Sequence, residues 1–454
     1  MLKMKTTMAL AITLLQAGAA FAAVSPEEAR QLGTTLTPTG AEKAGNKDGT
    51  IPEWTGGMTM PPAKFQPGSN KRVDPYADEK PRLVITGKDM GAHADKLTEG
   101  TKELLKRHAT MRVDVYPTHR PVYVPKHIAE NTRKNATGTR LTAEGLGTEN
   151  MLAGYPFPIP KNGNEVMWNH LLNYRGLGFN TKFDTWNVDA SGRASLATTG
   201  EATYAWPTTD AKRSGVINDT EPFWLLKFNY AAPARRKGEA MIVWDSANPL
   251  KQGRRAWLYL PGQRRVRLAP DIAYDTPNPG TAGASTYDDA SVFNGAMDRF
   301  DFKLVGKKEM IVPYGNYKMT YWAKPAEVAT PNHINPDVVR WEQHRVWVVE
   351  ATLKPGKRHV YSKRVFYIDE DSWVAVASDE YDARGQLYRA GFSFSSFSYD
   401  VPAQWVDTQG FYDFNAGVYS VPGLVGEYGG IRYLSELPPD TFWSAEQLAG
   451  QGIR

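Results

Sequence analysis

The sequence contains no cysteine among its 454 residues. This absence excludes a disulfide framework, thiolate metal ligands, a cysteine nucleophile and a lipid anchor on cysteine. Stability must therefore come from burial of apolar groups, and a chain of this length can enclose a large core. The sequence also lacks a strong charge of one sign, because its net charge is only +5 and its basic residues are dispersed. We therefore expect no nucleic-acid partner.

Motifs for metals, nucleotides and nucleophilic catalysis are lacking as well. None of the eight histidines shows the His-x-x-x-His or His-Glu-x-x-His spacing of a local metal site. There is no Gly-x-Ser-x-Gly nucleophile elbow and no phosphate-binding loop. The sequence therefore predicts no cofactor, no metal and no catalytic residue, and we expect a protein that is not an enzyme.

The first residues have the pattern of an export signal. Lys3 and Lys5 precede an apolar stretch from Met8 to Ala20, and Ala20-Phe21-Ala22 fits the small-x-small cleavage rule. We expect residues 1–22 to be a cleaved signal peptide and Ala23 to begin the mature chain. No later apolar run is long enough to span a bilayer. The sequence thus predicts a soluble protein of the Gram-negative periplasm without a lipid anchor.

The remaining composition favours a β-rich, loop-rich fold. The chain has 13 Trp, 22 Tyr and 17 Phe together with 40 Gly and 31 Pro. Amphipathic helical patterns occur up to about residue 180, and apolar residues alternate with a period of two thereafter. We predict a mainly β (α+β) fold, a large curved antiparallel sheet or half-open barrel with N-terminal helices packed on it. It forms a single domain over 23–454, in which 23–180 is helical and irregular and covers the sheet, whereas 181–454 is an antiparallel meander.

Individual elements follow from the same patterns. Helices are predicted from Ser25, over 95–110, 124–140 and 162–174, and over 444–449. The predicted strands are 183–187, 223–230, 240–245, 256–260, 264–268, 302–306, 318–322, 340–353, 357–368, 373–381, 387–399 and 410–419. Between 268 and 302 lies a polar loop of about thirty residues, far longer than the usual connection of a few residues, which is typical of a functional segment.

Aromatic side chains on these strands are the candidates for binding an apolar ligand. In the hairpin over 255–268, Trp257 and Tyr259 share one face of the strand, opposite Leu258 and Leu260. We expect the aromatic pair to face a cavity, because rings form a wide and fairly rigid apolar wall. The predicted ligand-binding residues are Trp257, Tyr259, Trp244, Trp347, Phe366 and Trp373. One alternative is that the aromatic rings of the strands fill the interface between sheet and helices. Another is that Leu258 and Leu260 face inward, with Trp257 and Tyr259 facing outward for a partner.

Charged residues of the hairpin and the long loop form a second candidate site. We predict contact with a partner or an anion for Arg254, Arg255, Arg264, Arg265, Arg267, Asp288 and Asp289. The alternative is a solvated edge in which the loop acids pair with these arginines. Asp288, Asp289 and Asp298 could also supply the paired carboxylates of a glycan- or lipid-acting hydrolase. No spacing in the sequence favours that chemistry.

Three long motifs carry a resemblance to a known family. They are LTPTGAEKAGNKDGTIPEWTGG (36–57), RRAWLYLPGQRRVRLAP (254–270) and DDASVFNGAMDRFDFKLVGKKEMIVPY (288–314). With them, nearly the whole mature chain resembles the family called "domain of unknown function 1329". The resemblance implies export to the proteobacterial periplasm and a fold similar to the lipoprotein-sorting (Lol) carriers. Those carriers are half-open antiparallel barrels, closed by helices, that hold acyl chains.

The resemblance also implies a function and partners. Family members are often encoded near an inner-membrane exporter of the resistance-nodulation-division (MmpL-like) type and an outer-membrane protein. We therefore predict a soluble periplasmic carrier or accessory subunit for a lipid-like or other hydrophobic molecule, working with an envelope transporter. The alternatives are a periplasmic hydrolase using the loop carboxylates and a structural subunit with a filled core.

Overall fold

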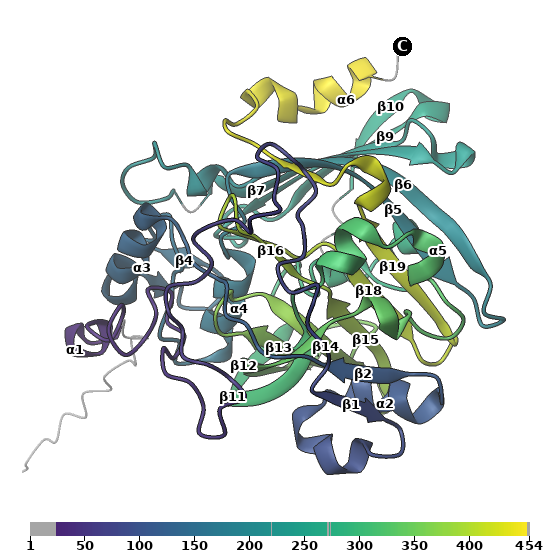
Figure 1. Cartoon of the computed structure of the whole chain (residues 1–454). Helices are drawn as coiled ribbons and strands as arrows, with labels where there is room; N and C mark the ends of the chain where they lie inside the picture. Colours follow the sequence, from purple (N-terminus) through teal and green to yellow (C-terminus); the bar gives the residue numbers. More distant parts are fainter. Residues whose placement is uncertain (1–23, 219, 270–271, 273, 452–454) are drawn as a thin grey trace, which may run out of the picture.

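The computed structural model describes residues 24–218, 220–269, 272 and 274–451, and one large sheet dominates it (Figure 1). Its sixteen strands are β1 (Leu83–Thr86), β2 (Arg112–Val115), β5 (Gly178–Val188), β6 (Ala194–Ala205), β7 (Pro222–Ala232), β8 (Ala240–Ser246), β9 (Arg255–Leu260), β10 (Arg265–Leu268), β11 (Phe300–Pro313), β12 (Trp341–Leu353), β13 (Lys363–Asp369), β14 (Ala375–Tyr381), β15 (Leu387–Ser393), β18 (Gln409–Asp413), β19 (Val418–Leu424) and β20 (Ile431–Tyr433). Two small ribbons, β3 (Arg140–Leu141) with β4 (Thr148–Glu149) and β16 (Ser396–Ser398) with β17 (Ala403–Trp405), complete the β structure.

The helices are short and lie outside or between the layers of the sheet. They are α1 (Pro26–Ala29), α2 (Glu99–Arg107), α3 (Lys126–Gly138), α4 (Gly163–Leu171), α5 (Pro325–Val328) and α6 (Ala445–Gln451). Side-chain caps fix the first residues of α1 and α4. The side chain of Ser25 accepts a hydrogen bond from the backbone N–H of Glu28, and the side chain of Asn162 accepts one from the backbone N–H of Glu165. Among the described residues, no helix has the length and apolar character needed to cross a bilayer.

The sheet bends so that its two ends face each other. Its strand order is β1-β2-β12-β13-β14-β15-β18-β19-β5-β6-β7-β8-β9-β10, with β11 added beside β12 and β20 beside β5. Almost all pairs are antiparallel, and one parallel contact joins β2 to β12. We call β11 to β15 the first arm and β5 to β10 the second arm. Figure 1 shows the arms as separate layers with α4 and β16 between them. This half-open, mainly β arrangement confirms the predicted fold class.

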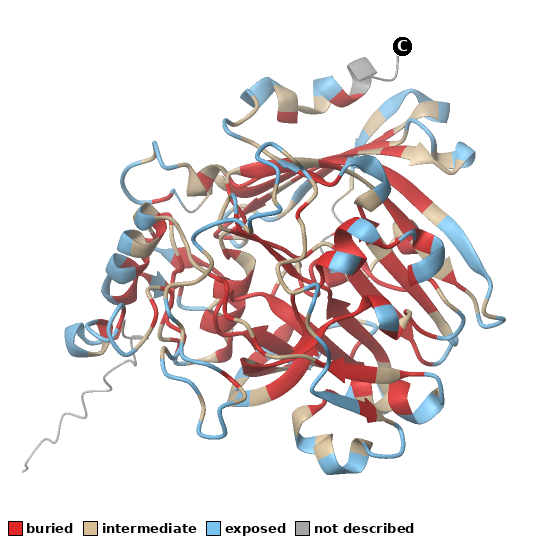
Figure 2. Ribbon diagram, viewed as in Figure 1, coloured by how far each residue is buried: buried red, intermediate tan, exposed pale blue. Residues whose placement is uncertain are grey.

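The main core lies between the arms. Buried residues of both arms belong to it, including Trp224 and Phe228 of β7 and Val349 and Phe366 of β12 and β13. Figure 2 shows the buried residues concentrated in this interior. A second core lies on the other side of the first arm, where α2 and residues 317–339 cover it. The second arm is covered on its outer side by Trp443 and Leu448 near the C-terminus.

Several predicted elements need correction. Residues Lys318–Trp322 form a helical turn of the π type, not a strand, and their consecutive residues Met319, Thr320 and Tyr321 are all buried. The predicted strand over 410–419 is two strands, β18 and β19, joined by a turn. Strands β1, β2 and β6 had no counterpart in the prediction. Residues before 181 contribute β1, β2 and the start of β5 to the sheet. The predicted signal peptide lies outside the described residues.

Candidate functional site

A cavity of about 150 Å³ lies against the inner face of the second arm. We call it the inner cavity. Its walls come from strands β5 to β8, the loop over 278–294 and residues around β17 and β19. The apolar lining consists of Phe183, Tyr204, Trp224, Leu226, Phe228, Tyr230, Met241, Tyr287, Trp405 and Phe411. An enclosed space walled by aromatic rings suits an apolar ligand.

Strand alternation explains this wall. Every second residue of β7, from Trp224 through Leu226 and Phe228 to Tyr230, points to the same side and lines the inner cavity. The intervening Leu225 points to the opposite side, where it packs against Trp443. The ring centroids of Phe228 and Tyr230 are 4.6 Å apart in an edge-to-face pair, so the wall is held by its own aromatic contacts.

The opposite side of the inner cavity is polar. Asp407 lines it, and one carboxylate oxygen of this residue is buried without a hydrogen-bond partner. The other oxygen accepts a 3.1 Å hydrogen bond from Ser291 and lies 3.7 Å from the Arg175 guanidinium. Burial raises the pKa of Asp407, although the positive charge of Arg175 opposes this effect. The same cavity is also lined by hydroxyl and amide side chains, so its aromatic wall is combined with a polar one; these residues are Thr181, Thr185, Thr198, Asn278, Thr281, Ser285, Asn294 and Gln409.

A second cavity of about 310 Å³, the outer cavity, lies beside the inner one toward the hairpin of β9 and β10. Tyr230 and Tyr287 line both cavities, so the two spaces share a wall of two phenol rings. Arg236, Glu239 and Arg267 give the outer cavity its charges. A space with an aromatic wall therefore adjoins a space whose lining, among the residues that the structure describes, has a net positive charge.

The structure does not bring the six predicted ligand-binding aromatics to one cavity. Trp257 and Tyr259 do share a face, but it is the outer one, where Tyr259 packs with Leu448. Trp244 lies there too and donates a 3.1 Å hydrogen bond to the carbonyl of Trp443. Tyr259 contributes to the wall of the outer cavity, beside Leu258 and Leu260. The predicted orientation of Trp257 toward the interior is therefore wrong, because the C-terminal segment covers that face.

The other three predicted aromatics lie on the first arm. Phe366 is buried in the main core with its ring centroid 5.3 Å from that of Phe293. Trp373 is buried as well, stacks on Trp347 at 6.1 Å and donates a hydrogen bond to the carbonyl of Thr39. These contacts are those of a packed interior. The proposals below therefore use the walls of the two cavities.

The predicted charged site divides into an internal and an external part. Arg254 forms two hydrogen bonds with Asp245 and donates to the carbonyl of Asn294, so it is an internal anchor. Asp288 and Asp289 are buried and accept hydrogen bonds from Arg364 at 3.0 and 2.8 Å. These three side chains, predicted to contact a partner or an anion, are thus paired with other residues inside the protein. The remaining arginines of the set, Arg255, Arg264, Arg265 and Arg267, are exposed on the hairpin.

The loop carboxylates do not form the paired acids that a hydrolase needs. Burial disfavours the charged form of Asp288, but Arg364 and His359 hold its pKa below the ordinary value. Asp289 also accepts a 2.8 Å hydrogen bond from the hydroxyl of Tyr361. Asp298 lies 3.7 Å from the Lys357 ammonium. Each acid thus has a cationic partner, and none of the three lines the inner cavity.

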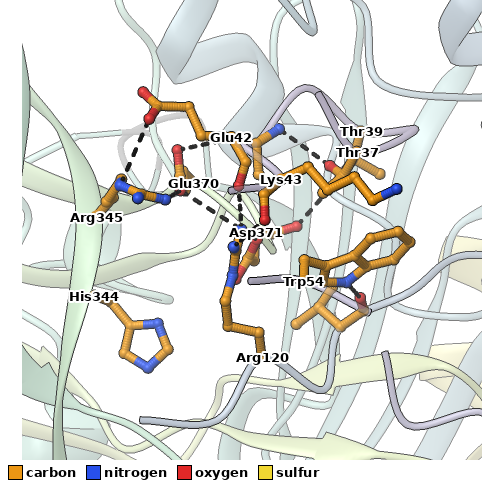
Figure 3. A network of polar contacts seen from close by, with 12 residues as sticks. Thr37, Thr39, Glu42, Lys43, Trp54, Arg120, His344, Arg345, Glu370 and Asp371 are labelled. Carbon is orange, nitrogen blue, oxygen red and sulfur yellow. Dashed lines mark hydrogen bonds and ion pairs between the residues drawn. The ribbon is translucent and has the colours of Figure 1, made fainter. Parts of the chain in front are cut away.

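A buried polar network lies away from both cavities and joins the N-terminal segment to the first arm (Figure 3). Arg120 is its centre, with two hydrogen bonds to Asp371 and further bonds to the carbonyls of Glu42, Lys43 and Pro52. Arg345 pairs with Glu370 at 3.2 Å. The network fastens residues 42–52 to the end of β13 and thereby closes one side of the molecule.

One part of this network has the composition of a metal site. Ligand atoms of His344, Asp369 and Asp371 lie within 4.8 Å of one another, and all three residues are buried. Both carboxylate oxygens of Asp371 already accept from Arg120, however, and a guanidinium repels a cation. The Nε2–H of His344 donates a 3.0 Å hydrogen bond to the carboxylate of Glu342. The group therefore fits an ion-pair cluster better than a metal centre.

The residues that line the inner cavity were recognisable only in part. Trp224 and Phe228 belong to a strand that the sequence predicts. The alternation of side chains along that strand places both on one face, and this is the signal by which they could have been predicted as cavity-lining residues. The cavity's polar side has no such signal, because Asp407 and Ser291 lie in irregular segments 116 residues apart.

Comparison with known proteins places the chain in a family. The model of the family described as "Protein of unknown function (DUF1329)" matches residues 84–449. "Uncharacterized protein PA3922" of Pseudomonas aeruginosa is 41% identical over 448 residues, which cover 98% of this chain and 97% of that protein.

Solved structures are more distantly similar. A DUF1329 family protein from Desulfovibrio piger is 16% identical, with a TM-score of 0.41 over 60% of this chain and 92% of that one. A putative outer membrane lipoprotein-sorting protein domain from Vibrio parahaemolyticus is 13% identical, with a TM-score of 0.41 over 60% of this chain and 91% of that one. The extent of the family match and the identity with the Pseudomonas protein show that the chain belongs to the DUF1329 family.

Proposed function

We propose that the protein is a carrier that binds the apolar part of a lipid-like molecule in its inner cavity. The observation that supports this proposal is the aromatic wall of β7, where Trp224, Leu226, Phe228 and Tyr230 face an unfilled space. Protein interiors are normally packed to crystal density, so an unfilled aromatic space is costly to maintain unless a ligand occupies it.

The size of the inner cavity limits what it holds. A volume of about 150 Å³ is below the roughly 300–1,000 Å³ of pockets that enclose a drug-sized ligand. It suits the end of one chain rather than a whole lipid. Each methylene removed from water contributes about 0.8 kcal/mol, so a segment of about six contributes about 5 kcal/mol before the cost of association.

The finer parts of the proposal concern location and partners. We place the carrier in the periplasm, reached through the N-terminal signal, where it passes its ligand between an inner-membrane exporter of the resistance-nodulation-division (MmpL-like) type and an outer-membrane protein. The resemblance to the family supports these partners. The absence of cysteine fits a carrier that moves between membranes without an anchor of its own.

The test is to purify the full-length protein from the periplasmic fraction without detergent and to extract it with organic solvent. We expect mass spectrometry to find an apolar molecule at up to one per chain. After delipidation, the neutral fluorescent probe N-phenyl-1-naphthylamine should bind saturably. If no extractable molecule is found and the delipidated protein binds no probe, the carrier function is refuted.

A further inference from the structure

We propose that the ligand is an amphiphile with an anionic head group, held head-outward by Arg236 and Arg267. In this arrangement the head group occupies the outer cavity, and the chain passes between Tyr230 and Tyr287 into the inner cavity. The inference rests on the proposed carrier function and assigns the chemical class and the direction of the ligand.

The first observation is the position of the two cavities. Both are lined by Tyr230 and Tyr287, so these two side chains lie between a space of about 150 Å³ with the aromatic wall of β7 and a space of about 310 Å³ that carries the charges of Arg236, Glu239 and Arg267. Tyrosine has an apolar ring and a polar tip, and it is suited to a boundary where one side is dry and the other wet. A molecule with an apolar chain and a polar head fits the two spaces together.

The second observation is an unsatisfied donor on Arg236. Its Nε donates a 2.9 Å hydrogen bond to Glu239, and its guanidinium lies 3.6 Å from the centre of the Tyr230 ring. Its Nη1 atom is buried and has no hydrogen-bond partner. Leaving a buried donor unpaired is costly, and more so for a charged group. Because Arg236 lines the outer cavity, a rotation of its side chain would bring this donor to a carboxylate or phosphate oxygen placed there.

The third observation is the direction of Arg267. It pairs in register with Leu258 across β9 and β10, which places both side chains on the cavity side of the hairpin. Arg267 is exposed and has no ion-pair partner within the described residues. Since Glu239 offsets Arg236, Arg267 gives the described lining of the outer cavity a net positive charge. Its planar guanidinium can bind a carboxylate or phosphate through two parallel hydrogen bonds.

The inner cavity sets the direction of the ligand. Asp407 lines this cavity and pairs with Arg175 at 3.7 Å, so the inner cavity offers an anionic head group no free positive charge. The charges of the two cavities therefore both favour a head group that faces outward.

The experiment measures competition against N-phenyl-1-naphthylamine on the delipidated protein by dodecanoate, dodecyl phosphate and neutral dodecanol. The variants are Arg236→Gln and Arg267→Gln. Arg255→Gln is the matched control, because it removes the same charge from the outer face of the same hairpin. We expect Arg236→Gln to weaken both anions about tenfold, and Arg267→Gln about two- to fivefold because it is exposed. Dodecanol should be unaffected by any variant, and Arg255→Gln should leave all three competitors unchanged.

The competitors also separate two sources of the head group. Tighter binding of dodecyl phosphate assigns a phosphate ester such as a phospholipid, and tighter binding of dodecanoate assigns a fatty acid. Thermal unfolding of each variant shows whether Arg236→Gln still folds, and the exposed Arg267→Gln provides the test if it does not. Dodecanol binding as tightly as the anions, with no effect of Arg267→Gln, would overturn the head-group assignment but leave the carrier function standing. Failure of the unmodified protein to bind any probe would instead refute the carrier function.

Discussion

Filling the inner cavity should make the protein more stable and abolish binding. At about 24 cal/mol per Å³ of cavity, filling the whole space of about 150 Å³ with side chains would add up to about 3.6 kcal/mol of stability. Leu226 lines this space from the middle of β7. Leu226→Phe places a larger side chain in it, and we expect the free energy of unfolding to rise by about 1 kcal/mol because only part of the space is filled.

Urea unfolding and probe titration together measure this effect. Leu226→Phe should shift the urea midpoint upward without changing the slope, and it should weaken N-phenyl-1-naphthylamine at least tenfold. The control is Leu225→Phe on the same strand. Leu225 faces the other side and packs against Trp443, so its enlargement should cost about 1–3 kcal/mol by overpacking and leave the probe affinity unchanged. If Leu226→Phe destabilises the protein as Leu225→Phe does and still binds the probe, the space is not the binding site.

Three further predictions test the surroundings of the site. Gly200→Ala should weaken probe binding severalfold in titration, because a Cβ there would lie 2.4 Å from Phe228 and push its ring into the inner cavity; unchanged affinity would contradict this. Arg120→Met breaks a buried pair with Asp371 and should lower the free energy of unfolding in urea by about 3–5 kcal/mol. The control Lys126→Met breaks an exposed pair with Glu130 and should lower it by less than about 1 kcal/mol. Burial raises the pKa of Glu380 to about 8. Between about pH 4.5 and 8 the folded state therefore binds more protons than the unfolded state, so the free energy of unfolding falls as pH rises through this window. Glu380→Gln should make this fall smaller when the free energy of unfolding is measured from pH 5 to 8.

Local pattern was sufficient to predict the kind of fold. Alternation along β7, β8 and β12 and the absence of helical crossovers led to a curved antiparallel sheet, which the structure contains. The same alternation correctly predicted that Trp257 and Leu258 point to opposite faces of their strand. Strand period is a property of neighbouring residues, so the sequence shows it directly.

The identity of the inner face could not be predicted in the same way. Both faces of the β9 strand carry apolar residues, and the face with Tyr259 is covered by Leu448, almost 190 residues later in the chain. Which face becomes the interior is therefore decided by a distant segment. For the same reason, the ligand-binding prediction selected Trp257 instead of the alternating residues of β7.

Charged residues in the long loop illustrate the same limit. Asp288 and Asp289 follow a stretch rich in Gly, Thr and Pro, a composition that indicates a solvated surface. Their partner Arg364 lies 76 and 75 residues away and is fully buried. A buried ion pair depends on two positions that only the fold brings together, so neither residue alone signals it.

These buried pairs bear on how a ligand enters. The loop over 278–294 covers the inner cavity, and Arg364 holds it through Asp288 and Asp289 while Arg254 holds it through Asn294. Lifting the loop would separate buried charges, and breaking such a pair costs about 3–5 kcal/mol. Entry past Tyr230 and Tyr287, which line both cavities, leaves these buried pairs intact. The easier route therefore runs through the outer cavity, which is also the route that leaves an anionic head group beside Arg267.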